Sequence, residues 1–250
     1  MTRWLMWKPL RLGGLFAVTL MLALAATVPL PVALAWSGAR DSMGYASARG
    51  TVWGGRIEGV GMAGLDLGTV RLALRPLALL TGQWRLDWFA EGRAGIGRGR
   101  AERGVIGDHM RVSRTRFQLD LAQAPTPLPF PVLGQAWIEA ERLQWQGRQC
   151  LKAEGQAGTD LLMRNSETLN WTGPRLRGPL ACRNGRLVAD LTGRTPSGGK
   201  AGLTLVLRPS GGGEGTLWID SDDARLATAL PALGFGHEND RYALTVEVAS

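Results

Sequence analysis

One short stretch carries a residue pattern that could bind a cofactor. Residues 59–64 read GVGMAG, which fits the G-x-G-x-x-G pattern of a dinucleotide-binding turn. That turn requires a helix directly after the glycines, so that the helix N-terminus faces the pyrophosphate. Here the glycines precede LDLGTVRLAL, whose apolar alternation changes phase between Leu67 and Val70. The pattern predicts a strand with a β-bulge at Gly68 or Thr69, and no nucleotide.

The other residue types used in chemistry are scattered. His109 and His237 belong to no ligand or catalytic spacing. Glu139 and Glu141 fall on one face of an expected strand, and three aspartates cluster within residues 220–223. Carboxylates of these kinds are typical of solvated faces and helix N-caps. With no P-loop and no G-x-S-x-G elbow, the sequence predicts a protein that is not an enzyme and that holds no metal and no cofactor.

The N-terminal segment is typical of a membrane anchor. No charged side chain occurs from Leu12 to Trp36. This uncharged run is long enough to cross a hydrocarbon core of about 30 Å. Basic residues precede this run, so we expect a cytoplasmic N-terminus over 1–11, a transmembrane anchor over 12–35 and a periplasmic domain over 36–250.

Three tryptophans and two prolines bear on how this segment is used. Trp4, Trp7 and Trp36 occupy positions expected for aromatic side chains at a membrane interface. The alternative is a cleaved secretory signal, because ALA at residues 33–35 resembles a cleavage site. Pro29 and Pro31 would bend or end a helix near its outer edge. Both alternatives place the folded part outside the cytoplasm.

The chain contains two cysteines, Cys150 and Cys182. In an exported chain an even pair predicts a disulfide, and the alternative is two buried free thiols.

Arginine supplies nearly all of the positive charge, and the formal net charge is +8. The richest segment is GRAGIGRGRAERG at residues 92–104. An exported location argues against a nucleic-acid partner for this segment. The alternatives are attraction to anionic lipid headgroups and an ordinary solvated face.

Short strands dominate the rest of the chain. Apolar residues alternate with polar ones over residues 241–248, and leucines recur at every second position from Leu203 to Leu207. The RNG at residues 183–185 lies between two apolar segments and predicts a tight β-hairpin. The fold class expected is therefore mainly β, with 35 glycines at turns and bulges.

Only one or two short helices are expected. PLALLTG at residues 76–82 starts with proline and ends with glycine, and DDARLATALPALGF at residues 222–235 starts with acidic residues and is cut by Pro231. The proline-rich segment at residues 124–134 is expected to be an extended connector. It is also a candidate boundary between two halves of the sheet.

Over nearly its whole length the chain resembles the family of type II secretion system protein N. The most specific segments are GTVWGGR at residues 50–56 and the segment from Leu67 to Trp88, followed by the two cysteines and the tail at residues 229–248. The motif residues carried by this resemblance are Gly50, Thr51, Val52, Trp53 and Gly55. The strand, turn and tryptophan-containing strand at residues 67–88 also resemble the broader group of AsmA-like envelope proteins.

The resemblance implies a single-pass protein of the bacterial inner membrane that supports export of folded proteins across the outer membrane. Its expected partners are other inner-membrane components of the secretion apparatus, with no nucleotide bound by this chain. The AsmA-like kinship implies a curved antiparallel sheet. It also leaves an alternative function open, in which tryptophans on a concave face bind or transfer membrane lipids.

Overall fold

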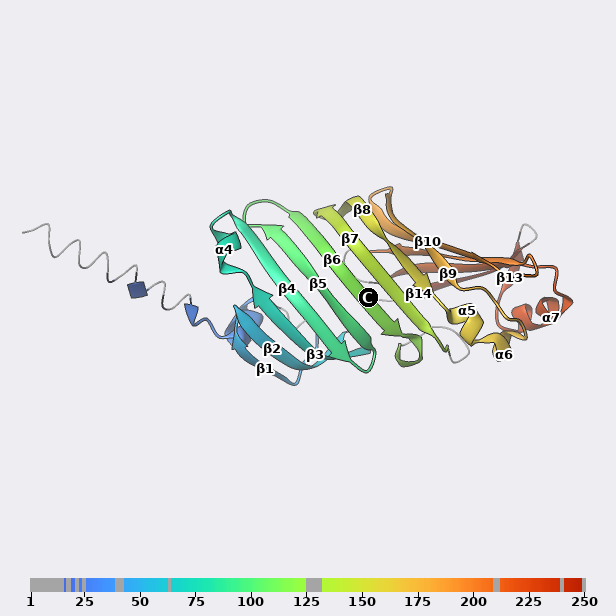
Figure 1. Cartoon of the computed structure of the whole chain (residues 1–250), viewed down its shortest axis with the longest axis horizontal. Coiled ribbons are helices and arrows are strands. Elements are labelled where there is room, and N and C mark those ends of the chain that lie inside the picture. Colours follow the sequence, from blue (N-terminus) through green and yellow to red (C-terminus); the bar gives the residue numbers. More distant parts are fainter. Residues whose placement is uncertain are drawn as a thin grey trace, which may run out of the picture.

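The structure is a computed structural model that describes residues 16, 19–20, 23, 26–38, 43–62, 64–124, 132–208, 212–238 and 241–248. These residues form a single antiparallel sheet of 14 strands (Figure 1). Each strand pairs with its neighbours in sequence, except that β14 lies between β12 and β13. The expectation of a mainly β fold is confirmed.

The first eight strands are β1 (Ser47–Thr51), β2 (Gly54–Met62), β3 (Leu65–Leu74), β4 (Gln83–Gly92), β5 (Gly95–Gly104), β6 (His109–Asp120), β7 (Gln135–Gln146) and β8 (Gln149–Thr159). The remaining strands are β9 (Leu176–Arg183), β10 (Arg186–Arg194), β11 (Lys200–Leu207), β12 (Gly213–Asp220), β13 (Gly236–Glu238) and β14 (Arg241–Val248). The helices are α2 (Leu30–Trp36), α4 (Pro76–Leu79), α5 (Leu161–Arg164), α6 (Ser166–Leu169), α7 (Ala224–Ala232) and a 3-10 turn at Leu121–Gln123.

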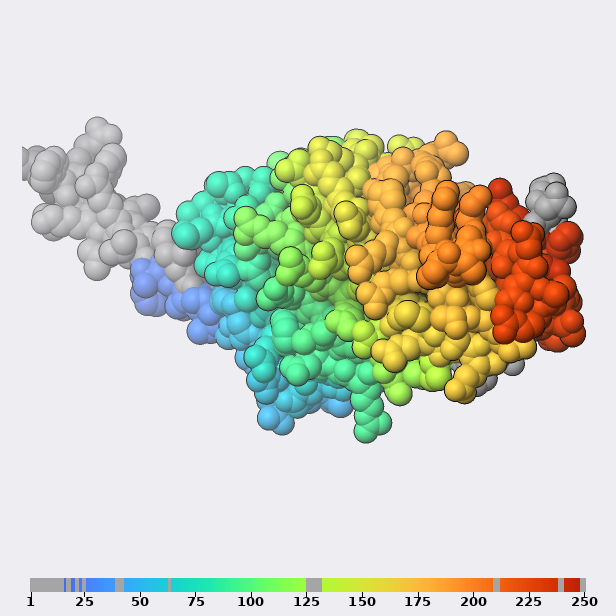
Figure 2. Space-filling model, turned by 45° about the vertical axis from the view of Figure 1, so that its right-hand side comes forward, coloured from blue at the N-terminus to red at the C-terminus, as the bar shows by residue number. Residues whose placement is uncertain are grey.

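Alternating side chains give the sheet one apolar and one polar face. Across β6 and β7, Phe117 faces Ile138 on the apolar face, and Arg116 faces Glu139 on the polar face. The sheet curves, so that its C-terminal strands pass behind β6 to β8 (Figure 1). Figure 2 shows these C-terminal strands, in orange and red, closing one end of the body.

The main hydrophobic core lies on the apolar face of the C-terminal half. Leu162 of α5, Leu169 of α6 and Leu226 of α7 are buried there against the sheet. The same core contains buried apolar side chains from β7 to β12, and the three short helices lie together at one end of these strands (Figure 1).

A second, smaller core covers the first strands. Leu30 and Leu34 of α2 pack with Ile57 and Val60 of β2. Val28 also accepts a backbone hydrogen bond from Val52, so residues 28–36 lie against the sheet. Thr27 and Val28 are not helical. The expected single helix over 12–35 is therefore interrupted before α2.

The described residues contain no helix that is both long enough and apolar enough to span a membrane. Most of the expected anchor, together with the cytoplasmic segment 1–11, lies outside the described residues.

Three tryptophans pack against glycines directly opposite them on the next strand. The pairs are Trp88 with Gly99, Trp137 with Gly158, and Trp218 with Gly202. A Cβ added at any of these glycines would lie 3.0 Å or less from atoms of the facing indole ring. The missing side chains therefore make room for the rings, which cover the glycines on both faces of the sheet.

Several local predictions are confirmed. The register of β3 against β4 shifts between Gly68 and Thr69, which is the expected bulge. Asn184 and Gly185 have φ of 51° and 72° and form the two-residue loop between β9 and β10. Residues 59–62 end β2 and Gly64 directly precedes β3, so a strand follows the glycines instead of a helix.

The helices depart from expectation in number. α4 and α7 lie where short helices are expected, α2 overlaps the end of the helix expected over residues 12–35, and α5 and α6 are additional. Pro231 is inside α7, whose last residue is Ala232, so the proline does not end the helix at that point. Residues 125–131 of the proline-rich segment are outside the described part, and the flanking β6 and β7 pair directly within the same sheet.

Candidate functional site: a charged trough on the polar face

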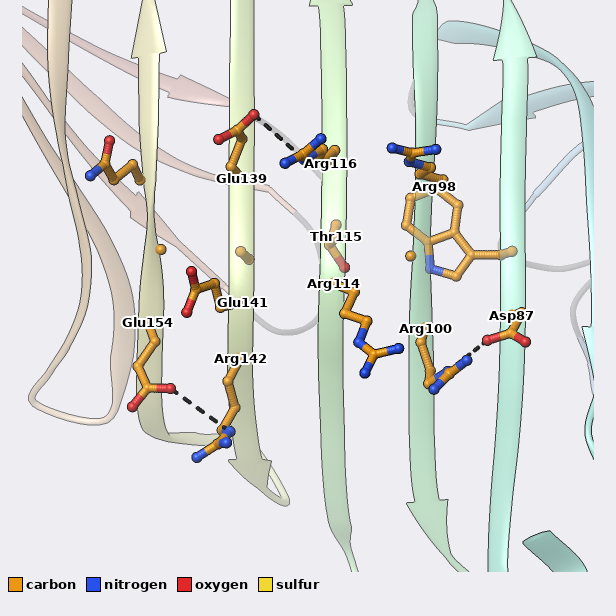
Figure 3. A pocket seen from close by; sticks show the side chains of 15 residues that line it. Asp87, Arg98, Arg100, Arg114, Thr115, Arg116, Glu139, Glu141, Arg142 and Glu154 are labelled. Carbon is orange, nitrogen blue, oxygen red and sulfur yellow. Dashed lines mark hydrogen bonds and ion pairs between the residues drawn. The ribbon is translucent and has the colours of Figure 1, made fainter.

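A cavity of about 1060 Å³ opens on the polar face and extends across β4 to β8. Charged side chains from five neighbouring strands line it (Figure 3). We call this surface the charged trough, and its charged residues are Asp87, Arg98, Arg100, Arg114, Arg116, Glu139, Glu141, Arg142 and Glu154.

Two bulges shape the floor of the trough. Between β5 and β6 the register shifts from Arg98 to Arg100, where β6 has one residue more than β5. Between β7 and β8 it shifts from Ala140 to Arg142, where Glu141 is the extra residue. Bulges bend a strand and redirect its side chains, so these two shifts give the central strands a local hollow.

Ion pairs between strands neutralise part of the trough. Arg100 Nε lies 2.7 Å from Asp87 Oδ1, and Arg75 Nε lies 2.6 Å from Asp87 Oδ2. Arg116 Nε lies 3.6 Å from Glu139 Oε1. The Arg100–Asp87 and Arg116–Glu139 contacts join neighbouring strands, whereas Arg75 reaches Asp87 from the N-cap of α4.

A second shared carboxylate lies at the β7–β8 side of the trough. Glu154 binds Lys152 at 2.6 Å and Arg142 at 3.8 Å. The hydrogen bond from Lys152 lowers the pKa of Glu154.

Asp87 is the most heavily engaged carboxylate of the trough. Partial burial raises the pKa of its side chain, but the hydrogen bonds from Arg100 and Arg75 together outweigh this, so the pKa is lowered. The same hydrogen bond raises the pKa of Arg100. Asp87 therefore stays ionised and holds two arginines in place.

Three charged side chains of the trough have no hydrogen bond or ion pair within the described part of the chain: Arg98, Arg114 and Glu141. Arg114 and Glu141 stand opposite each other in the β6–β7 ladder, between Ser113–Arg142 and Thr115–Ala140. Figure 3 shows that they diverge, because Arg114 extends toward Arg100 on β5 and Glu141 extends toward β8.

Arg114 also has a φ of 52°, in the left-handed region. A side chain at that φ places its Cβ close to the following carbonyl, which costs roughly 1–2 kcal/mol in a residue other than glycine. Arg114 thus combines an unpaired charge with an unfavourable backbone conformation.

A smaller hollow of about 290 Å³ adjoins the trough and shares Arg98, Arg116 and Glu139 with it. Its lining includes the apolar residues Phe89, Ile96 and Trp137. The side chain of Ile96 is 46% exposed. The polar face therefore presents an apolar hollow directly beside unpaired and paired arginines.

The residues singled out in the sequence lie in different places. Cys150 and Cys182 form a disulfide, which confirms the expected pairing. His109 begins β6, and His237 on β13 packs edge-on against Tyr242 with ring centroids 4.9 Å apart. Within the described ranges, no group of three or more His, Cys, Asp or Glu side chains is placed to hold a metal ion.

The family-motif residues Gly50, Thr51, Val52, Trp53 and Gly55 lie together at the β1–β2 hairpin. Gly50 has a φ of 89°, and a Cβ on Gly55 would lie 2.5 Å from Leu30 Cδ2. The hairpin thereby makes room for α2. Trp36 is 84% exposed at the end of α2, and Trp4 and Trp7 lie outside the described residues.

Sequence reasoning identified only part of the trough. It singled out Glu139, Glu141 and the segment 92–104, which supplies Arg98 and Arg100, and it missed the β6 arginines. A usable signal is the spacing of two in Arg98–Arg100 and in Arg114–Arg116, which places each pair on one face of a regular strand.

The fold and the site define an antiparallel sheet protein with an open, charged face. Comparison with protein families matches residues 30–245 to "Type II secretion system (T2SS), protein N". The chain belongs to this family and is a component of the type II secretion system. No curated protein and no solved structure was found to match it.

Proposed function

We propose that the protein is a non-enzymatic accessory component of the bacterial inner membrane that supports export of folded proteins from the periplasm across the outer membrane. The observation that carries this proposal is the family match over residues 30–245. The charged trough supports a docking role, because a surface that spans five strands and stays open suits a macromolecular partner.

The proposed topology has a cytoplasmic N-terminus, one membrane-spanning segment and a periplasmic sheet. Support comes from the uncharged run that starts at Leu12 and from the basic residues before it. α2 packs on the sheet, so the proposed span lies before Val28. The partners proposed are other inner-membrane components of the secretion apparatus.

The proposal is tested by an in-frame deletion in the native host. An exoprotein of the system is quantified in the periplasm and in the medium, with the intact gene as the complementing control. We expect the exoprotein to accumulate in the periplasm and the intact gene to restore its release.

A lipid-binding or lipid-transfer role is the second candidate. It is favoured by half-buried apolar-face side chains of the middle strands, including Leu72, Trp88 and Phe117. The tryptophans as a set do not favour it, because Trp137 and Trp218 lie on the polar face and Trp171 is buried in the main core. Normal export with altered outer-membrane permeability in the deletion strain would favour lipid handling.

A further inference from the structure

We infer that the charged trough and its adjoining hollow bind a segment of another polypeptide that carries two acidic side chains beside an apolar one. This inference names a surface for the docking role proposed above and rests on it. The segment's carboxylates would bind Arg98 and Arg114, and its apolar side chain would enter the hollow at Phe89, Ile96 and Trp137.

The unpaired positive charge of the trough is the first argument, because it favours acidic side chains in the bound segment. Two carboxylates of the trough are already engaged by arginines, Asp87 with Arg75 and Arg100, and Glu139 with Arg116. Arg98 and Arg114 have no such partner in the described ranges. Arginine forms strong, geometrically specific hydrogen bonds with carboxylates, so these two guanidinium groups are available to bind anions in the trough.

The second argument is the conformation of Arg114. Glycine and asparagine are the residues usually found at a φ near 52°, yet an arginine occupies it. Its side chain extends in the direction of Arg100, another positively charged residue of the trough (Figure 3). Unfavourable conformations of this kind concentrate at ligand-binding sites, where a bound anion offsets them.

The third argument is that the trough carries both signs of charge. Glu139, Glu141 and Glu154 line the side formed by β7 and β8. They repel a uniformly anionic polymer or a densely anionic membrane surface. A polypeptide can instead present carboxylates to β5 and β6 and a basic side chain to the unpaired Glu141.

The hollow accounts for the apolar part of the segment. It shares Arg98 and Arg116 with the trough, so a side chain bound there lies next to the arginines. Ile96 is substantially exposed, and burying apolar surface of this kind is favourable. A segment that combined glutamate and leucine would satisfy both parts of the surface.

Binding is tested with the full chain in detergent and a rhodamine-labelled peptide of sequence Lys-Ser-Glu-Leu-Glu, measured by fluorescence anisotropy. The comparison peptide has glutamine in place of both glutamates. The test variant is Arg98→Gln/Arg114→Gln. The matched control is Arg93→Gln/Arg148→Gln, which removes the same charge from two exposed turn residues outside the trough.

We expect the test variant to lose about tenfold or more in affinity, because two charge-assisted hydrogen bonds are removed, and the control to stay within about twofold. The glutamine peptide should bind as weakly as the test variant does.

Three results would overturn the inference. They are equal losses in the test and control variants, no binding of the peptide by the unmodified chain, and arginine-dependent binding of phosphatidylglycerol vesicles or inorganic phosphate without peptide binding. The assay is independent of export, so its failure would leave the result of the deletion experiment standing.

Discussion

Cys150 on β8 and Cys182 on β9 are bonded where the ladder between those two strands has already ended. β8 and β9 are in register only from Gln156–Pro179 to Thr159–Leu176. The cysteines lie beyond that ladder, with their Cα atoms 5.5 Å apart. Cys150 N–H donates to the carbonyl of Gly185, so the disulfide joins β8 to the β9–β10 hairpin.

Replacing both cysteines, as Cys150→Ala/Cys182→Ala, should lower the free energy of unfolding by roughly 3–4 kcal/mol, because the bond closes a long loop in the unfolded chain. Urea unfolding with and without a reducing agent provides the measurement. The unmodified protein should lose the same amount on reduction, and the variant should not respond to the reducing agent. A variant as stable as the oxidised protein would contradict the prediction.

At position 114, glycine and alanine should differ in their effect on stability. Arg114→Gly removes the charge and the cost of the left-handed backbone, whereas Arg114→Ala removes only the charge. The glycine variant should therefore be more stable than the alanine variant by about 1 kcal/mol in chemical unfolding. The matched pair is Arg116→Gly and Arg116→Ala, where alanine should be the more stable. If the glycine and alanine variants ranked in the same order of stability at positions 114 and 116, the backbone cost at Arg114 would be refuted.

Asp87 should make stability depend on pH. The pKa of Asp87 is lower in the folded protein than in the unfolded chain, where it is about 4. Its contribution to the free energy of unfolding is therefore fully present above that unfolded pKa and is lost as the pH falls through the folded pKa. Asp87→Asn should cost about 1 kcal/mol at pH 7 and much less near pH 2. Urea midpoints at the two pH values measure this. Asp108→Asn is the control, because Asp108 and its partner Arg103 are both exposed, and its effect at pH 7 should be smaller.

α2 should contribute to the stability of the folded domain. Leu34 is 8% exposed and packs with Ile57, so Leu34→Ala should cost about 2–4 kcal/mol. Val32→Ala on the same helix is the control, because Val32 is 39% exposed. Thermal unfolding of the two variants in detergent distinguishes them. Equal melting temperatures would show that α2 does not stabilise the sheet.

The tryptophan–glycine pairs predict that a methyl group added at Gly202 destabilises the protein. A Cβ on Gly202 would lie 2.4 Å from Trp218 Cζ2, and the ring is itself covered by Arg241. Gly202→Ala should cost about 1–3 kcal/mol through overpacking. Gly54→Ala should be close to neutral, since nothing lies within 4 Å of a Cβ there. Calorimetry of both variants is the measurement.

Local features of the fold were predictable where a single segment determines them. The phase change around Gly68 predicts its bulge, and Asn184–Gly185 predicts its hairpin, because each depends on a few adjacent residues. α5 and α6 were not predictable in this way. Helices of four residues are too short to show a helical period, and tertiary packing of Leu162 and Leu169 stabilises them.

The trough depends on register, which alternation within one strand does not determine. Arg98 and Arg116 meet because β5 and β6 pair in one particular register. Glu141 lines the trough together with Glu139, but the bulge at β7 makes it the extra residue of the β7–β8 ladder, which the alternation within one strand does not reveal. Sequence patterns therefore identify the charged strands, whereas the three-dimensional pairing of the strands defines the site.

The strand order has a consequence for how the chain acquires its fold. Almost every strand pairs with the strands directly before and after it in sequence, so each hairpin closes as soon as its second strand has been synthesised. Assembly can therefore proceed from the N-terminus by addition of one strand at a time. Among the described strands, β14 departs from this order because it lies between β12 and β13, so that edge of the sheet cannot form before β14 has been synthesised.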